Sequence, residues 1–598
     1  MAFSPVLLTG VRLCGISSYI AEQSLLGSVL PEGHRKMADF SVLIAGKAGD
    51  GINQAGILLS RLLSERGYRI YMSFDYQSLI RGGHNFSVIR ASRTPVSACR
   101  EKIDFLLALN QDAVDFHKQK LTDSSRIAYD SDSIKSDPAA GQGLGLPLAK
   151  IIKEEGALPI MRNSCLMGAF SRCVGIEWEV LERVFRKHIP RQTDLNLKLA
   201  RRGFDSAKQV TQLEFQAQTP LPVFTGNEAI GLGFIKAGLK TYIAYPMTPS
   251  SNLLHFLADA ADDFSLKVIH PESEIAVILM ALGFAYAGEK VAVGTSGGGF
   301  CLMNEGLSFS GMAELPVAIV LGQRPGPSTG LPTYTSQTEL NFALNAGQGE
   351  FVRFVVAPAD AEQAFYWSQV ALNMSWKYQI PSIILSDKEM AEGAFSFDID
   401  RVKTVEEQGP LFWDRKDAYK RYKDTETGVS PLAFAPDKDA VIKVNSYEHD
   451  EYGITTEEAL DTKKMQEKRL RKGTPLSQEL EAYDTVSVYG KKDSPAAILC
   501  WGSNKGVCTE AGDNLGLRVI QVHVLSPFPV KKFDEALGGV KKLISVENNA
   551  TGQLARLVGS YGFTVNERIG KYDGRSFSVE QLEAELEDKL EGKLEERI

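Results

Sequence analysis

Hydrophobic and polar positions along the chain follow two alternating periods. Short apolar runs of strand length, FSVLIAG, RIYMS, NFSVIRA and DFLLALN, occur between residues 40 and 110, and Ile52 to Glu65 has apolar residues at helical spacing. A similar strand–helix order starts again at Phe224 and at Ala496. We therefore expect an α/β fold made of three α/β units, with parallel sheets covered by helices.

Changes in residue composition along the chain suggest where these units end. A Gln/Thr/Pro-rich stretch at 209–222 is typical of a linker, and 33 of the 90 residues in 401–490 are charged, against 23% in the whole chain. We expect an N-terminal extension at 1–37, α/β domains at 38–215 and 216–400, a charged connector at 401–490, and a third domain at 491–598 with an acidic helical tail. An exposed connector with solvated helix is favoured over a binding role for the charged segment.

Composition excludes several classes of partner. The net charge of -8 leaves no basic surface for nucleic acid, and no run of about 20 uncharged apolar residues predicts a membrane span. The seven cysteines are scattered, with no CxxC pair and no two closer than eight residues. This spacing predicts a reducing cytoplasmic setting, and it argues against a disulfide framework or an iron–sulfur cluster held by this chain alone.

Two glycine-rich segments of the first unit are candidates for binding phosphate. GKAGDGIN, with Gly46, Gly49 and Gly51, lies between a strand and a helix, where backbone N–H groups can approach an anion. Its spacing does not fit the dinucleotide fingerprint GxGxxG, and a purely structural turn is the alternative. In LIRGGHN, Arg81 stands beside Gly82 and Gly83 and could grip phosphate or carboxylate, or could be an exposed arginine in a hairpin turn.

Three polar segments of the second unit follow predicted strands. In YPMTPSS two prolines hold Thr248 on a rigid turn, and in HPESEIAV Glu274 opens a long apolar helix. Arg324 begins a loop, GQRPGPSTGLP, in which six of eleven residues are glycine or proline. Each has a structural alternative: a capped turn, a carboxylate that favours a helix N-terminus, and a solvated surface loop.

Taken in order, these segments resemble a known enzyme family. TGNEAIGLGFIKAGLKTYIAYPMTPSS, HPESEIAV, GTSGGGFCLMNEGLSFSGMAELPVAIVLGQRPGPSTGLPT, YEHDEYG and SVENNATGQLARL are similar to motifs of the fused gamma–alpha subunit of the 2-oxoacid:ferredoxin oxidoreductases, particularly the 2-oxoglutarate type. The resemblance covers about Asp39 to Phe563. It implies a gamma-type domain on the coenzyme A side, a thiamine-diphosphate-binding pyrimidine domain, and a transketolase C-terminal-like domain.

The resemblance also assigns roles to residues. Glu274 matches the glutamate that hydrogen-bonds the aminopyrimidine of thiamine diphosphate, and Thr248 and Arg324 match positions that contact the substrate. The implied cofactor-binding residues are Glu274, Tyr245 and Pro246 on the thiamine side, and Gly46, Gly49, Gly51, Arg81, Gly82 and Gly83 on the coenzyme A side. Met247 stands where the family usually has isoleucine, and Ala48 where many relatives have glycine.

The resemblance further implies an obligate partner. No NN pair follows Gly49-Asp50-Gly51 at the distance of a diphosphate–metal motif, and the pair Asn548-Asn549 lies in the third unit. We expect no metal site on this chain, and a beta subunit that carries Mg2+, the diphosphate and a 4Fe–4S cluster in an (alpha-beta)2 assembly.

The expected activity is the reversible, coenzyme A-dependent oxidative decarboxylation of a 2-oxoacid, with electrons passed to ferredoxin. 2-Oxoglutarate is the favoured substrate, with pyruvate and branched or aromatic 2-oxoacids as alternatives. A nicotinamide dehydrogenase would need a proper dinucleotide fingerprint. A non-catalytic scaffold would leave Thr248, Glu274 and Arg324 without a purpose.

Overall fold

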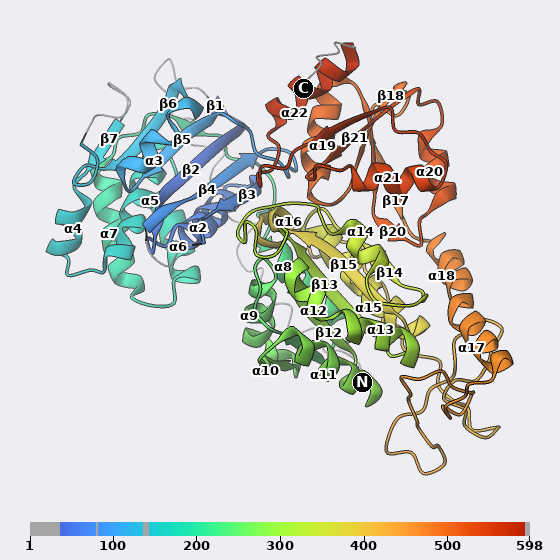
Figure 1. Ribbon diagram of the computed structural model, residues 1–598. Coiled ribbons are helices and arrows are strands. Elements are labelled where there is room, and N and C mark those ends of the chain that lie inside the picture. The colour runs from blue at the N-terminus through green and yellow to red at the C-terminus, as the bar shows by residue number, and fades with distance from the viewer. Residues whose placement is uncertain (1–35, 79–81, 136–142, 592–598) are drawn as a thin grey trace.

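A computed structural model describes residues 36–78, 82–135 and 143–591, which form three α/β bodies (Figure 1). Nearly all of the expected N-terminal extension, residues 1–35, lies outside the described residues, as does Arg81. The last two residues of the expected extension form a short strand, β1 (Lys36–Met37), which pairs with β8 (Gln212–Leu213). In the described part of the chain, no helix has the length and apolarity needed to cross a membrane.

The first body contains an eight-stranded sheet. Its strands in spatial order are β7 (Gly143–Leu146), β6 (Leu121–Asp130), β5 (Ile103–Ala108), β2 (Asp39–Ala48), β4 (Gly82–Ser92), β3 (Arg69–Asp75), β16 (Ala394–Ser396) and β9 (Val223–Thr225). Its helices are α2 (Ile52–Ser64), α3 (Gln111–Asp115), α4 (Leu148–Glu154), α5 (Arg162–Cys173), α6 (Trp178–His188) and α7 (Thr193–Ser206). The helix expected at 52–65 is confirmed as α2.

The expectation of an all-parallel first sheet is wrong. β2, β5, β6 and β7 are parallel to one another, but β4 is antiparallel to both β2 and β3. The physical reason is the length of the connection from β3 to β4, which is shorter than the dozen or more residues that a parallel crossover needs. The described part of LIRGGHN, from Gly82 to Asn85, therefore opens the second strand of a hairpin, in line with its structural alternative.

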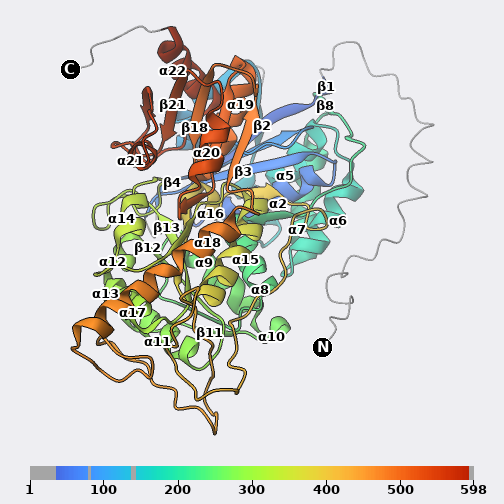
Figure 2. The same cartoon turned by 90° about the vertical axis from the view of Figure 1, so that its right-hand side faces the viewer.

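The first sheet continues into the second body. β9 and β16 come from the sequence of the second unit, and β16 pairs antiparallel with β3. Figure 2 shows α16 (Lys388–Glu392), which leads into β16, directly below β3 and β4. The two units are thus joined by backbone hydrogen bonds, and the end of β3 lies against the second body.

The second body is built on a seven-stranded sheet that is parallel except at one edge. Its strands in spatial order are β11 (Lys267–Ile269), β10 (Thr241–Ala244), β12 (Val291–Ser296), β13 (Val317–Gln323), β15 (Pro381–Asp387), β14 (Phe354–Val356) and β20 (Val524–Ser526). Its helices are α8 (Gly226–Lys236), α9 (Ser251–Asp259), α10 (Ala261–Phe264), α11 (Glu274–Tyr286), α12 (Gly297–Leu302), α13 (Asn304–Ala313), α14 (Leu340–Asn345) and α15 (Ala361–Tyr378), in addition to α16. Strands β10, β12, β13, β14 and β15 are buried along their whole length, as expected for a parallel sheet covered on both faces, whereas the edge strand β11 is partly exposed.

The third body has a five-stranded sheet. Its strands in spatial order are β17 (Val486–Gly490), β19 (Arg518–Val522), β18 (Ala496–Cys500), β21 (Lys542–Glu547) and β22 (Glu567–Gly570). Its helices are α19 (Lys505–Leu515), α20 (Val530–Leu537), α21 (Gln553–Ser560) and α22 (Val579–Glu591), the last of which is the acidic tail and packs on α19. β20 leaves this body and pairs antiparallel with β14, so the third sheet is also tied to the second.

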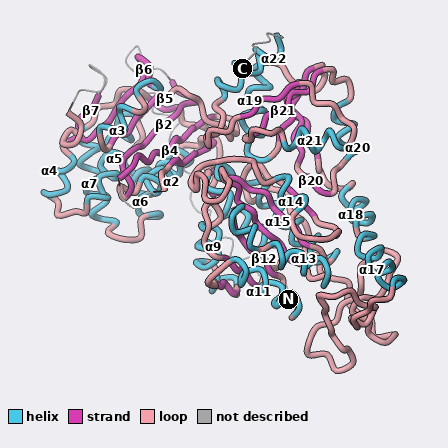
Figure 3. The backbone as a smooth tube through the Cα atoms, in the orientation of Figure 1, coloured by secondary structure: helices cyan, strands magenta, loops and turns pink. Residues whose placement is uncertain are grey.

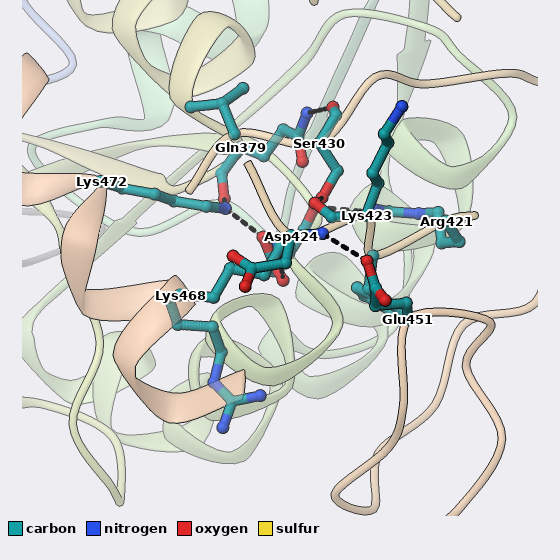
Figure 4. Close-up of polar contacts among 12 residues, drawn as sticks. Gln379, Arg421, Lys423, Asp424, Ser430, Glu451, Lys468 and Lys472 are labelled. Carbon is teal, nitrogen blue, oxygen red and sulfur yellow. Dashed lines mark hydrogen bonds and ion pairs between the residues drawn. The ribbon is translucent and has the colours of Figure 1, made fainter. Parts of the chain in front are cut away.

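The charged segment differs from an exposed connector. Figure 3 shows a long run of loop that leads into α17 (Ala459–Arg471) and α18 (Gly473–Leu480). Lys468 of α17 is fully buried and lies 2.7 Å from Glu314, and Lys472 also forms an ion pair with Glu314 (Figure 4). Burial raises the pKa of Glu314, but Lys468, Lys472 and Arg421 together bring it well below its usual value. A cluster of buried charges therefore fastens this segment to the second body.

Candidate functional site

Four neighbouring parallel strands deliver the candidate residues to one edge of the second sheet. In the order β11, β10, β12 and β13, each strand is followed by a polar or glycine-rich segment. These segments contain Glu274, Thr248, Gly297 to Gly299 and Arg324, respectively. Open α/β sheets bind their ligands at the carboxyl ends of such strands. The fold thus gathers the three residues that the sequence predicts as catalytic.

Glu274 is a buried carboxylate at a helix N-terminus. It is the first residue of α11, whose N-cap Ser273 accepts a hydrogen bond from the backbone N–H of Ala276. Glu274 is only 5% exposed, and its carboxylate has no hydrogen-bond partner within the described ranges. A Cβ added to Gly299 would lie 2.6 Å from Oε1 of Glu274, so α12 approaches this carboxylate closely. The carboxylate oxygens of Glu274 are therefore available to accept a hydrogen bond from a ligand.

Thr248 and Arg324 are held in a rigid arrangement. The Thr248–Pro249 peptide bond is cis, and the buried Asn227 Nδ2 donates a hydrogen bond to Pro249 O at 2.9 Å. Arg324 is 8% exposed, and its Nη1 donates to Thr248 O at 3.0 Å. Burial lowers the Arg324 pKa, and Glu339 opposes this shift. A guanidinium with little solvent around it favours an anionic ligand.

The thiamine-side residues of the same turn are at the surface. Tyr245 and Pro246 are exposed, and the ring centroid of Tyr245 lies 6.0 Å from that of His270. The Met247 sulfur accepts weak hydrogen bonds from the hydroxyls of Thr295, at 3.7 Å, and Ser296, at 3.5 Å. Met247 therefore packs against the carboxyl end of β12, between the Thr248 turn and the helix that approaches Glu274.

The two glycine segments of the first unit lie side by side. Ala48 pairs with Gly82 where β2 ends and β4 begins, so the turn that contains Gly46, Gly49 and Gly51 is adjacent to Gly82 and Gly83. The first turn is partly filled by its own carboxylate, because Asp50 Oδ2 accepts from Lys47 N and Asp50 Oδ1 lies 2.9 Å from Arg162 Nη2. Gly82 and Gly83 have positive φ angles of 78° and 72°.

Sequence reasoning missed Glu339 and Tyr76, which lie near Arg324, and Glu392, which is hydrogen-bonded to Tyr76. Burial raises the pKa of Glu339 to about 7, while Arg324 opposes the rise. Burial also raises the pKa of Glu392, at the end of α16, to about 7, and its Oε1 accepts a hydrogen bond from Tyr76 Oη at 3.0 Å. Glu392 closely follows β15, a further strand whose carboxyl end meets the same edge, and this position was the available signal. Tyr76 could not be found in this way, because it comes from the first unit.

The pair Asn548-Asn549 has a structural role. Asn549 Nδ2 donates to Gln337 O at 3.1 Å, and Asn548 N donates to Gln337 Oε1 at 3.0 Å. These bonds fix the long loop after β13 against the third body. Among the residues described, no group of three or more His, Cys, Asp and Glu side chains is placed to hold a metal ion.

Comparisons with known proteins identify the family of this chain. Residues 232–469 match the family described as "Pyruvate flavodoxin/ferredoxin oxidoreductase, thiamine diP-bdg", and residues 41–206 match "Pyruvate ferredoxin/flavodoxin oxidoreductase". The second body is thus a thiamine-diphosphate-binding domain of a 2-oxoacid oxidoreductase. The chain is 30% identical to the 2-oxoacid:ferredoxin oxidoreductase subunit alpha of Saccharolobus solfataricus, over 91% of this chain and 96% of the relative. It belongs to the alpha subunits of the 2-oxoacid:ferredoxin oxidoreductases, an enzyme family.

Two further relatives have names that mention a particular 2-oxoacid. The 2-oxoglutarate oxidoreductase subunit KorA of Mycobacterium tuberculosis is 29% identical over 73% of this chain and 69% of its own length. The 2-oxoglutarate:ferredoxin oxidoreductase from Magnetococcus marinus, solved with 2-oxoglutarate, coenzyme A and succinyl-CoA bound, is similar in structure with a TM-score of 0.84. It is 27% identical, and the match covers 93% of this chain and 100% of that one.

Proposed function

We propose that this chain forms the pyrimidine side and the substrate-carboxylate side of an active site that oxidatively decarboxylates 2-oxoglutarate to succinyl-CoA. The observation that carries the proposal is the buried carboxylate of Glu274, which has no partner in the described ranges and lies at the same sheet edge as Thr248 and Arg324. Thiamine diphosphate, when bound, supplies the electron sink for decarboxylation.

Each of these residues has a defined task in the proposal. Glu274 would hydrogen-bond a ring nitrogen of the aminopyrimidine and share a proton with it, which a buried carboxylate does far better than a solvated one. Arg324 and Thr248 would bind the carboxylate next to the substrate ketone, since a guanidinium and a hydroxyl are both donors to carboxylate oxygens. Tyr245 and Pro246 would border the cofactor from the exposed side of the turn.

The choice of substrate and of the thioester acceptor is part of the proposal. The relatives from M. tuberculosis and M. marinus support 2-oxoglutarate, and the bound ligands of the M. marinus enzyme support coenzyme A. We assign coenzyme A to the paired segments around Gly46 to Gly51 and Gly82 to Gly83. Arg81, which directly precedes Gly82 in the sequence, belongs to the same assignment. Asp50 already occupies the Lys47 N–H of the first turn and is itself paired with Arg162 of α5, so the second segment would make the larger contribution.

A partner subunit would complete the site. The helix α11 is apolar on all sides, yet Ile275 and Leu279 beside Glu274 are 51% and 49% exposed. A helix of this composition is normally covered, and the exposed face supports a subunit interface next to the cofactor. In the proposal a beta subunit brings Mg2+, the diphosphate site and the 4Fe–4S cluster, reduces ferredoxin, and assembles with this chain as (alpha-beta)2.

A cytoplasmic location is also part of the proposal. The six cysteines of the described residues are free thiols, which supports a reducing compartment.

The test is anaerobic co-production of this chain with its beta subunit, followed by electron-carrier reduction with coenzyme A and a panel of 2-oxoacids. The proposal predicts the highest kcat/KM with 2-oxoglutarate and no turnover by this chain alone. A clear preference for pyruvate or a branched 2-oxoacid would overturn the substrate. Turnover by the chain alone would overturn the shared site.

A further inference from the structure

A cleft of about 480 Å³ lies where the three bodies meet. Its walls come from β3, β4 and the loop between β4 and β5 in the first body, from α16 and the loop after β13 in the second, and from the segment between β22 and α22 in the third (Figure 1). The volume is within the ~300–1,000 Å³ typical of sites for organic ligands. None of the described residues that line the cleft is assigned above to thiamine diphosphate, the 2-oxoacid or coenzyme A. The cleft is thus separate in its residues from the proposed active site.

The cleft is lined by more cations than carboxylates. Six lysine and arginine side chains line it against four aspartates and glutamates, which is an excess of two positive charges. The six cationic residues are Arg100, Lys102, Lys120, Lys388, Lys571 and Arg575. The chain as a whole has a net charge of -8, so this positive excess is a local feature.

Each of the four carboxylates already has a partner inside the protein. The contacts are Asp75 with Arg575 at 3.5 Å, Glu389 with Lys388 at 3.4 Å, Asp573 with Lys571 at 2.9 Å, and Glu101 with the Ser578 hydroxyl at 3.3 Å. These contacts engage Lys388 and Lys571 as well. Arg100 is paired outside the cleft, with Asp39 and Glu510.

Three cationic groups therefore remain for a ligand. Lys102 and Lys120 form no ion pair within the described ranges, and Lys120 Nζ lies 5.4 Å from the centroid of the Phe86 ring. The Arg575 guanidinium carbon lies 3.9 Å from the centroid of the Tyr334 ring. This contact uses the face of the guanidinium, while its N–H groups point outward in the plane of the group and can still donate. The lysines belong to the first body and Arg575 to the third, so one ligand between them would contact both.

Phosphate groups suit these three donors. A phosphate carries up to two negative charges and several acceptor oxygens, and both ammonium and guanidinium groups bind it well. The cleft also has an apolar wall made of Phe86, Val88, Ile103 and Phe577. A free phosphate ion has no group to cover this wall, whereas the flat base of a nucleotide has one.

We propose that this cleft binds a nucleoside diphosphate or triphosphate, whose phosphates contact Lys102, Lys120 and Arg575 and whose base lies against the apolar wall. A ligand in this position touches all three bodies, so its binding stabilises their arrangement. The inference does not rest on the proposed function, because binding is measured without turnover.

The test is calorimetric titration of ATP and ADP into the complex of this chain with its beta subunit. The complex is first saturated with thiamine diphosphate, Mg2+ and coenzyme A, so that the sites for these phosphate-bearing ligands are filled. We expect one further site per chain, binding that weakens as ionic strength rises, and a higher melting temperature with the nucleotide bound. Lys102→Gln and Lys120→Gln should each raise Kd by about tenfold or more, because each removes one charged donor to phosphate.

The matched control is Lys118→Gln. Lys118 is an exposed lysine of the same segment as Lys120 and does not line the cleft, so this variant should keep the Kd of the unmodified complex. The inference is overturned if neither nucleotide binds at about 1 mM, if both cleft variants keep full affinity, or if Lys118→Gln loses as much affinity as they do. Citrate that binds more tightly than either nucleotide would overturn the phosphate class of the ligand. A complex that binds ATP at this site but oxidises no 2-oxoacid would refute the proposed function and leave the inference standing.

Discussion

The close approach of α12 to Glu274 makes a prediction that can be calculated from distances. A Cβ added at Gly299 would lie 2.6 Å from Glu274 Oε1 and 2.1 Å from Thr295 Oγ1, whereas ordinary contact begins near 3.4 Å. The variant Gly299→Ala must therefore displace the Glu274 carboxylate by about 0.8 Å. Misplacement of a catalytic group by about 1 Å can reduce turnover about 100-fold, so we expect kcat to fall between tenfold and 100-fold.

Gly298 provides the control, because alanine there has the same effect on the helix backbone without the contact with Glu274. At Gly298 the nearest atom to an added Cβ is Met247 Cε at 3.8 Å, which is ordinary contact. Gly298→Ala and Gly299→Ala gain the same helix propensity of about 1 kcal/mol, but only the second adds an overpacking cost of about 1–3 kcal/mol.

The assay is carrier reduction by the reconstituted complex at saturating 2-oxoacid and coenzyme A, with circular dichroism to confirm folding. A folded Gly299→Ala variant that retains the kcat of the unmodified complex would refute a role for this contact in turnover. A Gly298→Ala variant that loses as much activity as Gly299→Ala would refute it equally.

Three other predictions follow from the same structure. Arg324→Lys replaces a planar guanidinium with a point charge, so KM for the 2-oxoacid should rise about tenfold to 100-fold with a smaller change in kcat, and an unchanged KM would exclude Arg324 from the carboxylate site. Leu279→Lys should weaken association with the beta subunit in size-exclusion chromatography without lowering the melting temperature of the chain alone, and a stable complex would exclude this face of α11 as the interface. Glu314→Gln leaves Lys468 and Lys472 buried without an anion, which should cost about 3–5 kcal/mol of stability at pH 7 in thermal melts. Burial lowers the Lys472 pKa to about 7 from 10.5, so the unfolded chain binds more protons between these values and stability rises with pH there. Glu314 favours the protonated form of Lys472, so its removal lowers the Lys472 pKa further and stability rises more steeply with pH in the variant than in the unmodified chain. The deficit of the variant should therefore be smaller at pH 9 than at pH 7, and an equal deficit at both values would contradict burial of charged lysines.

The alternation of strands and helices was predictable because each element of a covered sheet buries a continuous apolar run. The segments from Phe40 to Gly46 and from Ile52 to Glu65 appear as β2 and α2 for this reason. The antiparallel direction of β4 was predicted only as the hairpin alternative for LIRGGHN, although the short connection at 76–81 excludes a parallel crossover. The spacing of apolar residues predicts which positions are buried, but it does not predict whether a strand runs parallel or antiparallel to its neighbour.

The candidate site was predictable in part. Thr248, Glu274 and Arg324 follow neighbouring strands, so topology alone brings them to one edge. Tyr76 and Glu392 are 316 residues apart and meet only because β16 joins the first sheet, a pairing that no local pattern encodes. The burial of Lys468 was likewise hidden, because a charged helix has the same composition whether its lysines face solvent or a single buried Glu314.

The central claim, that this chain presents a carboxylate to the cofactor, is tested most directly by Glu274→Gln in the complex with the beta subunit. The substitution keeps the shape of the side chain and removes its charge. Since Glu274 is proposed to share a proton with the pyrimidine, kcat should fall by about 100-fold or more while the subunits still assemble. Full activity of the assembled Glu274→Gln complex would contradict the account and would favour a scaffold role for this chain.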